Sequence, residues 1–116
     1  MNSSYYQGMI SDYQNKRRYY QDVISNVNFL LGEIGSCTDY VDGNASIVKS
    51  ITINGLPIYA NGLFNVTSLL RGANNLFQDV IAECSDKIEY CDEKITYYNS
   101  LLTDALARES TPEAQE

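Results

Sequence analysis

The chain has 116 residues and a net charge of −7, a size that accommodates one domain. Residues 59–116 carry four basic and ten acidic side chains, so we do not expect nucleic acid as a ligand, because backbone phosphates require a positive surface. No apolar run approaches the roughly 18 residues that span a bilayer, so direct membrane insertion is not expected.

The amino-terminal residues indicate a protein that begins in the cytoplasm. They contain neither the basic start nor the apolar run of a cleavable signal peptide. We therefore expect a cytoplasmic location, and export together with a partner would use a route other than a cleaved signal.

A seven-residue apolar repeat predicts a first helix over about residues 4–49, with a serine as its N-cap. Steps of four and three alternate along it, which is the period of a seam between packed helices. Gly32, Gly35 and Gly43 each weaken the helix by roughly 1 kcal/mol relative to alanine, so its second half requires packing. The seam positions are Tyr6, Ile10, Tyr13, Arg17, Tyr20, Ile24, Val27, Leu31, Ile34, Thr38, Val41, Ala45 and Val48.

Residues 51–59 change from a helical to an alternating apolar pattern. β-Branched residues precede the pair Asn54-Gly55, and this combination is the strongest short signal for a β-hairpin. Pro57 restricts the ribbon to a short, edge-like pair. We predict a short β-hairpin-like bend here, and the alternative is an ordinary polar loop.

The repeat then resumes and predicts a second helix over about residues 61–107, with Asn61 as its N-cap. Residues 109–116 have no apolar pattern and are predicted to be a disordered acidic tail, which leaves residues 1–108 as the helical domain. The seam positions of this helix are Leu63, Thr67, Leu70, Asn74, Phe77, Ile81, Cys84, Ile88, Cys91, Ile95, Tyr98, Leu102 and Ala105.

The two repeats predict an all-α fold, a long antiparallel two-helix hairpin. When the chain is folded back at the bend, the numbers of facing seam residues sum to 108, so that Tyr20 meets Ile88. This register places the basic run 16–18 beside acidic residues of the second helix. We expect the guanidinium of Arg17 to reach past the seam to Asp92.

The residue types argue against catalysis, metal binding and disulfides. Histidine is absent, and Cys84 and Cys91 lie two helical turns apart, about 10 Å, which is beyond disulfide reach. Cys37 lies far from both, and free thiols in core positions fit a reducing compartment. The acidic run of the second helix follows a solvated face. We predict a non-enzymatic protein without a metal or cofactor.

Apolar side chains beside the seam indicate a further binding surface. They are offset by one position from the seam, and so wide an apolar stripe is typical of a bundle of three or more helices. Tyrosine combines a large apolar body with a polar tip and is enriched in interface cores. We predict as partner-binding residues Met9, Tyr19, Val23, Leu30, Leu69, Leu76, Val80, Tyr90, Tyr97 and Leu101.

A family resemblance covers nearly the whole chain. The segments that carry it are Asp12-Tyr13-Gln14-Asn15-Lys16-Arg17, Thr52-Ile53-Asn54-Gly55 and Cys84-Ser85-Asp86-Lys87-Ile88. In this pattern the chain resembles the LXG-toxin-associated small helical proteins of Gram-positive type VIIb secretion, within the WXG-like hairpin superfamily. The resemblance implies an adaptor or targeting chaperone. Its partners would be the helical domain of a larger toxin and, in a larger complex, a second small helical protein.

Two family signals differ in this chain. It has no tryptophan, and Tyr59-Ala60-Asn61-Gly62 stands where WXG relatives carry Trp-x-Gly. Many substrates of the system carry an aromatic residue followed four positions later by an acid. The one such pair here is Phe29 with Glu33, which we predict as the export signal.

A second hypothesis belongs to a different class of protein. Two hairpins would form a symmetric four-helix bundle, as a structural protein or an exported WXG-like homodimer. A stable dimer of the purified chain favours this alternative, whereas a monomer or a polydisperse aggregate favours a missing partner.

Overall fold

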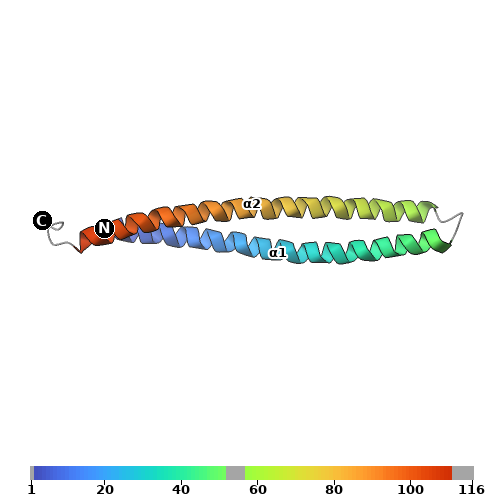
Figure 1. Cartoon of the computed structure of the whole chain (residues 1–116), viewed down its shortest axis with the longest axis horizontal. Coiled ribbons are helices and arrows are strands. Elements are labelled where there is room, and N and C mark those ends of the chain that lie inside the picture. The colour runs from blue at the N-terminus through green and yellow to red at the C-terminus, as the bar shows by residue number, and fades with distance from the viewer. Residues whose placement is uncertain (1, 52–56, 111–116) are drawn as a thin grey trace. The chain divides into compact units, whose positions relative to one another are not determined.

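The computed structural model describes residues 2–51 and 57–110, and they form two helices. Helix α1 spans Asn2–Ile51 with 50 residues, and α2 spans Pro57–Glu109 with 53 residues (Figure 1). No strand occurs within these two ranges. The predicted all-α helical hairpin is confirmed.

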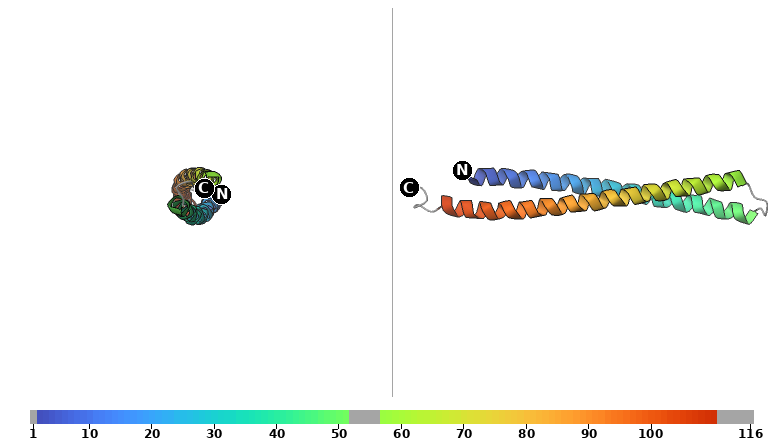
Figure 2. Two further views of the ribbon diagram at one scale, coloured as in Figure 1. Left: turned by 90° about the vertical axis from the view of Figure 1, so that its right-hand side faces the viewer. Right: turned by 90° about the horizontal axis from the view of Figure 1, so that it is seen from above.

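The chain consists of two compact units. Unit 1 comprises residues 1–24 and 83–116, and unit 2 comprises residues 25–82. In each unit, a segment of α1 and a segment of α2 run side by side in opposite directions, as the two views of Figure 2 show. Each unit is therefore an antiparallel pair of helices.

The helices are longer at the bend than predicted. Helix α1 ends at Ile51 and α2 begins at Pro57, so the β-hairpin-like bend predicted over 51–59 is wrong at Ile51 and at 57–59. Proline is favoured at the first helical position, because its missing amide has no helical acceptor there and its fixed φ suits the helix. The remaining residues of the predicted bend, 52–56, lie outside the described residues.

The outer ends also extend beyond the prediction. Helix α1 begins at Asn2, and α2 continues to Glu109. The Ser110 amide donates to the Leu106 carbonyl at 3.0 Å, and the Ser110 hydroxyl donates to the Ala107 carbonyl at 3.0 Å. The tail predicted from residue 109 is therefore wrong at its first residue, and residues 111–116 lie outside the described residues.

The predicted seams form the interior of each unit. Every seam position whose side chain is described is buried or half-buried. The reason is geometric, since the alternating steps of four and three keep these residues on the side of the helix that faces its neighbour. The buried seam residues are Val27, Val41 and Thr67 in unit 2, and Ile10, Cys84, Cys91 and Ala105 in unit 1.

Contacts between the helices of unit 1 agree with the predicted register. The ring of Tyr13 lies 6.2 Å from that of Tyr90 and 6.1 Å from that of Tyr98, centroid to centroid. The Nε of Arg17 donates to Oδ1 of Asp92 at 2.6 Å. The predicted contact between these two charged side chains is therefore confirmed.

The interior of each helix pair is thin. The largest wholly buried side chain is Cys91, which is 2% exposed. Because a pair of helices covers only one side of each helix, apolar side chains beside the seam keep much of their surface in water. Large apolar side chains therefore remain exposed in both units.

Candidate functional site

Positions that flank the seam give each helix pair two different sides. In each heptad the seam residues are a and d, the residue before a is g, and the residue after d is e. Antiparallel helices are related by a twofold axis perpendicular to both, so the g positions of one helix lie on the same side as those of the other. We call this side of each unit the g face and the opposite side the e face.

Residue type separates the two faces. The e positions of α1 are polar or glycine, whereas four of its g positions are apolar or cysteine. The e positions are Gln7, Gln14, Gln21, Asn28, Gly35 and Asp42. The described g positions are Met9, Lys16, Val23, Leu30, Cys37 and Asn44 on α1, and Val66, Ala73, Val80, Lys87, Lys94, Leu101 and Arg108 on α2.

Burial follows the same division. Every e position described on either helix is exposed. Several g positions are half-buried, which shows that the helices in each unit are rotated with their g sides inward. This rotation is favourable because it removes apolar area from water while the amide and carboxylate side chains of the e face stay hydrated. The half-buried g residues are Met9, Val23, Asn44, Ala73, Val80, Lys94 and Leu101.

The g face of unit 2 is rich in exposed leucine. Leu69 is 74% exposed and Leu76 is 62% exposed, and they lie two turns apart on α2 beside its g positions. Leu30 contributes from α1 and Val66 from α2, and both are also exposed. We call Leu30, Val66, Leu69 and Leu76 the leucine patch.

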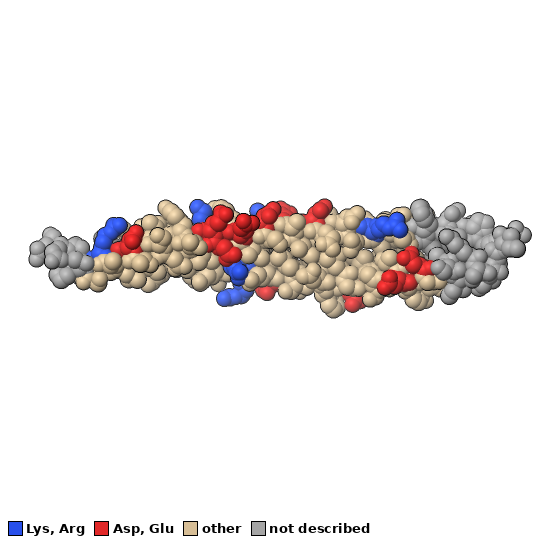
Figure 3. Space-filling model, viewed as in Figure 1, with Lys and Arg blue, Asp and Glu red and all other residues tan. Residues whose placement is uncertain are grey.

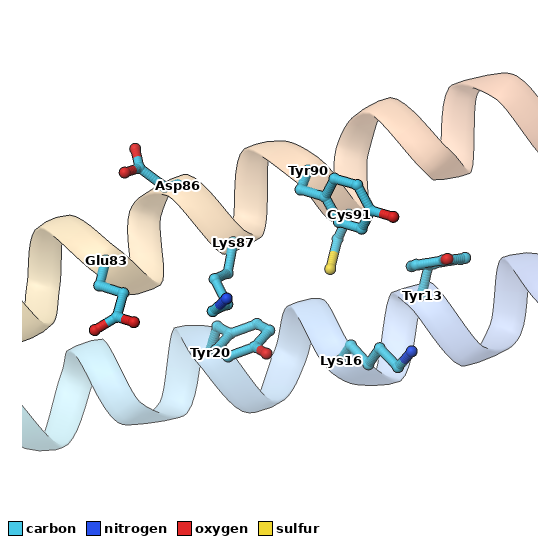
Figure 4. Close-up of a pocket in the computed structure, with 8 residues that line it drawn as sticks. All are labelled: Tyr13, Lys16, Tyr20, Glu83, Asp86, Lys87, Tyr90 and Cys91. Atoms are coloured by element: carbon cyan, nitrogen blue, oxygen red, sulfur yellow. The ribbon is translucent and has the colours of Figure 1, made fainter.

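The g face of unit 1 contains a groove lined by tyrosine and lysine. Its volume is about 560 Å³, and Figure 4 shows the Cys91 thiol pointing between the helices at its base. Both helices contribute charged and aromatic side chains to it. We call it the tyrosine–lysine groove, and its lining residues are Tyr13, Lys16, Tyr20, Glu83, Asp86, Lys87, Tyr90 and Cys91.

Two exposed tyrosine rings of unit 1 contact tyrosines of the seam. Tyr97 is 55% exposed, yet its ring centroid lies 5.1 Å from that of the seam residue Tyr98. Tyr19 is likewise exposed and lies 5.4 Å from the seam residue Tyr20. Edge-to-face contacts of this kind orient a ring while leaving one face in water. The exposed tyrosines of unit 1 are therefore held in place by the seam beneath them.

The electrostatics of the groove involve both titratable tyrosines and lysines. Partial burial, followed by a hydrogen bond with Tyr90, raises the pKa of the Tyr13 hydroxyl above its ordinary value. The Nζ of Lys16 lies 4.9 Å from the Tyr13 ring centroid. The Nζ of Lys94 lies 5.6 Å from the ring of Tyr90. The raised pKa favours the neutral form of the Tyr13 hydroxyl, and both ammonium groups lie at cation–π distance from tyrosine rings.

Acidic side chains do not occupy the described g positions. In the view of Figure 3 one group of them lies over α2, and others lie over α1. Asp79, Asp86 and Glu93 lie at the outer f positions, and Asp92 lies on the e face, where it pairs with Arg17. This ion pair is largely solvated, with side chains 37% and 52% exposed, so it contributes at most about 1 kcal/mol.

The predicted partner-binding residues fall into two classes. Those that the structure leaves exposed are Tyr19, Leu30, Leu69, Leu76, Tyr90 and Tyr97. Those that are half-buried within their own unit are Met9, Val23, Val80 and Leu101. The second class supports the helix pair as well as bordering the g face, because part of each side chain already lies against the neighbouring helix.

The two residues of the predicted export signal occupy an outer f position, Phe29, and a c position beside the g face, Glu33. Phe29 is 69% exposed, and Glu33 is exposed one turn further along α1. Phe29 occupies an outer f position, so the pair is accessible on the helix surface. Its role as a signal stays a prediction.

Sequence reasoning missed the lysines of the groove. The sequence places residues 16–18 in one basic run. Of these three, only Arg17 forms an ion pair with a described residue, and Lys16 lies over the Tyr13 ring. Lys87 and Lys94 were not considered at all. The signal that finds them is their shared g position, one heptad apart on α2.

The described residues offer no other chemistry of note. They include no cluster of three or more histidine, cysteine, aspartate or glutamate side chains able to hold a metal ion. Cys84 and Cys91 are buried free thiols, whereas Cys37 is exposed, so the prediction of a core position is wrong for Cys37. It lies at a g position that the neighbouring helix does not cover. Neither helix, over its described length, is apolar enough to cross a membrane.

No protein family, curated protein or solved structure matches this chain in our comparisons.

Proposed function

We propose that this protein is a non-enzymatic adaptor or targeting chaperone that packs along the helical domain of an LXG-type toxin and promotes its type VII export. The observation that carries the proposal is the uncovered g face of each unit, with the leucine patch in unit 2 and the tyrosine–lysine groove in unit 1. An exposed apolar surface of this kind marks an interaction site.

The energetics favour a covered g face. Burying a leucine side chain contributes about 1.5 to 3 kcal/mol when it moves fully out of water. Leu69 and Leu76 are mostly exposed, so most of this free energy is still available for binding. Along the same segments of both helices, the e face carries polar residues and glycine, so we expect a partner to bind only on the g face.

A helix is the form of partner that fits this surface. The g positions of the two antiparallel helices repeat every seven residues, and a third helix that docks between them meets side chains at the same spacing. Its apolar residues would lie between those of α1 and α2 at the spacing used in helix-in-groove recognition. Each unit would thereby become a three-helix bundle.

The identity of the partner rests on the resemblance to LXG-toxin-associated helical proteins. In that family, small helical proteins bind the long helical domain of a toxin before export. The paired arms of this hairpin and its one-sided apolar surface support the same role. We propose Phe29 and Glu33 as an export signal, because they are the one aromatic–acid pair with the required spacing.

Coexpression with an LXG helical domain tests the proposal. The unmodified chain is expected to copurify with the domain in a fixed ratio. Replacing Leu69 and Leu76 by glutamate places two charges in the leucine patch and is expected to abolish copurification. Because these two side chains are mostly exposed, the helix content by circular dichroism is expected to stay unchanged.

The matched control adds the same charges to the other face of the same segment. Asn75→Glu with Gln78→Glu changes two exposed residues of α2 in unit 2 that lie outside the leucine patch. This variant is expected to copurify as the unmodified chain does. The proposed binding surface is contradicted if the variant with glutamate at Leu69 and Leu76 still copurifies. It is also contradicted if the control variant loses copurification to the same extent.

A further inference from the structure

Unit 1 differs from unit 2 in the charge of its g face. Where unit 2 presents leucine and valine, unit 1 presents Lys16 from α1 and Lys87 and Lys94 from α2. All three are cations, although the protein carries a net charge of −7. Every charged residue at a described g position of unit 1 is therefore a cation, on a protein of negative net charge.

These lysines are not committed to carboxylates of their own unit. Among the described residues none of the three forms an ion pair. Lys16 and Lys94 lie over tyrosine rings instead. Figure 4 shows Lys87 extending into the groove toward Tyr20. An ammonium held over a ring keeps its charge and has donors left for a further partner.

The two acidic residues that line the groove form no ion pair with its lysines. Figure 4 shows the Asp86 carboxylate directed away from the groove, whereas the Glu83 carboxylate points toward α1 at the end away from Tyr13 and Cys91. Lys16 and Lys87 therefore border a stretch of groove whose other walls are tyrosine rings and the Cys91 thiol. Each wall of the groove therefore offers an ammonium group to a carboxylate of a partner, Lys16 from α1 and Lys87 from α2.

We propose that unit 1 binds an amphipathic helix whose apolar stripe is edged by carboxylates spaced one heptad apart. Lys87 and Lys94 are seven residues apart on one helix, so two acids at that spacing on a neighbouring helix face both lysines at once. Lys16 contributes from the opposite wall of the groove. The inference rests on the proposed function, and it adds the charge pattern by which this end of the partner is selected.

Charge also favours such a helix over a second copy of this chain. A copy docked through the same face brings a second set of g-position cations, and only the neighbouring c-position acids Asp12, Glu83 and Asp104 offset them. Like charges placed opposite each other at an interface oppose association. The complementary partner is therefore an acidic helix and not the same surface.

Two designed peptides test this inference on the full chain. Each is a fluorescently labelled helix of about four heptads with leucine at its a and d positions, and the two differ only in carrying glutamate or lysine at e and g. Binding is measured by fluorescence anisotropy at low and high salt. The glutamate peptide is expected to bind about tenfold more tightly than the lysine peptide, with the preference declining as salt rises.

The same peptides are then measured against a protein variant with reversed charge. Lys87→Glu with Lys94→Glu is expected to reverse the preference, so that the lysine peptide binds more tightly. Arg18→Glu is the matched control, because Arg18 is an exposed cation of the same unit outside the g face. This control is expected to leave the preference unchanged.

The outcomes separate this inference from the proposed function. The inference of a carboxylate-edged partner helix is overturned by any of three results. These are equal binding of the two peptides, no binding of either peptide, and an unchanged preference after the charges of Lys87 and Lys94 are reversed. Copurification with the LXG domain and its loss in the leucine-patch variant are measured independently. The proposed function therefore stands or fails on that result alone.

Discussion

Arg17 shows how a charged side chain occupies a seam position. Its guanidinium leaves the seam and contacts Asp92 on the e face, at 2.6 Å between Nε and Oδ1. Arg17 is half-buried, as expected for an arginine whose methylene groups lie against apolar surface while its guanidinium stays in water. The ion pair thus permits a charge at this position, and the burial of the stem supplies the packing.

Replacing Asp92 by asparagine tests this division. The change is expected to lower the free energy of unfolding by less than about 1 kcal/mol, and by less still at high salt, because the pair is solvated. Urea denaturation at two salt concentrations measures the effect. Glu93→Gln is the control, since Glu93 is exposed and lies outside the seam contact. A loss above about 2 kcal/mol contradicts a surface role for the pair.

The three thiols lie in different environments. Cys37 is exposed, whereas Cys84 and Cys91 occupy buried seam positions. In the native protein we expect an alkylating reagent to modify Cys37 rapidly and the other two only after the helices open. Mass spectrometry of timed samples counts the modified thiols, with a urea-denatured sample as the control. Equal rates at all three cysteines contradict the described burial.

At the scale of the element, α1 is a long helix that contains several poor helix formers. Gly32, Gly35 and Gly43 lie outside its seam, and a Cβ added to any of them meets no atom within 4 Å. These glycines therefore provide no close approach within the described part of the hairpin. They weaken the helix without improving its packing against α2.

Alanine substitution at these glycines is expected to stabilise the protein. Each of Gly32→Ala, Gly35→Ala and Gly43→Ala is expected to raise the free energy of unfolding by about 0.5 to 1 kcal/mol, because alanine loses less conformational entropy on entering a helix. Thermal or urea denaturation measures the change. Gly72→Ala makes the same comparison in α2, where the added Cβ also meets open space. If any of these substitutions lowers the free energy of unfolding, the glycine concerned does not lie in a helix with open space for a Cβ.

The whole molecule combines a thin interior with an uncovered g face in each unit. A helix pair without a partner keeps leucine and tyrosine in water, which lowers solubility and favours weak association. The proposed adaptor is therefore expected to be most stable in a complex, because a partner that binds only the folded state shifts the folding equilibrium.

Sedimentation velocity separates the adaptor from the homodimer. For the purified chain at low micromolar concentration we expect a monomer with weak, concentration-dependent association. The variant with glutamate at Leu69 and Leu76 is expected to show less association, because its leucine patch is charged. A stable dimer under these conditions contradicts the adaptor and supports the symmetric four-helix bundle.

The amino-acid sequence by itself determined the helices and their seam. Alternating steps of four and three along residues 6–48 and 63–105 allow only one side of each helix to face a neighbour, and the described seam side chains are accordingly buried or half-buried. The contact of Arg17 with Asp92 also followed from the register, because Asp92 is next to Cys91, the seam residue that faces Arg17. Periodicity is a local property, so it can be read before the chain folds.

Only the tertiary structure decided how far the helices extend and which lysines lie in the groove. Helix α1 includes the β-branched Ile51, and α2 begins at Pro57, which is suited to the first position of a helix, so the helical segments are longer than the apolar pattern indicated. Lys16 and Lys87 come from distant parts of the sequence and meet only when α1 and α2 pair. The rotation that turns the g positions inward depends on both helices at once, which is why neither helix alone reveals the groove.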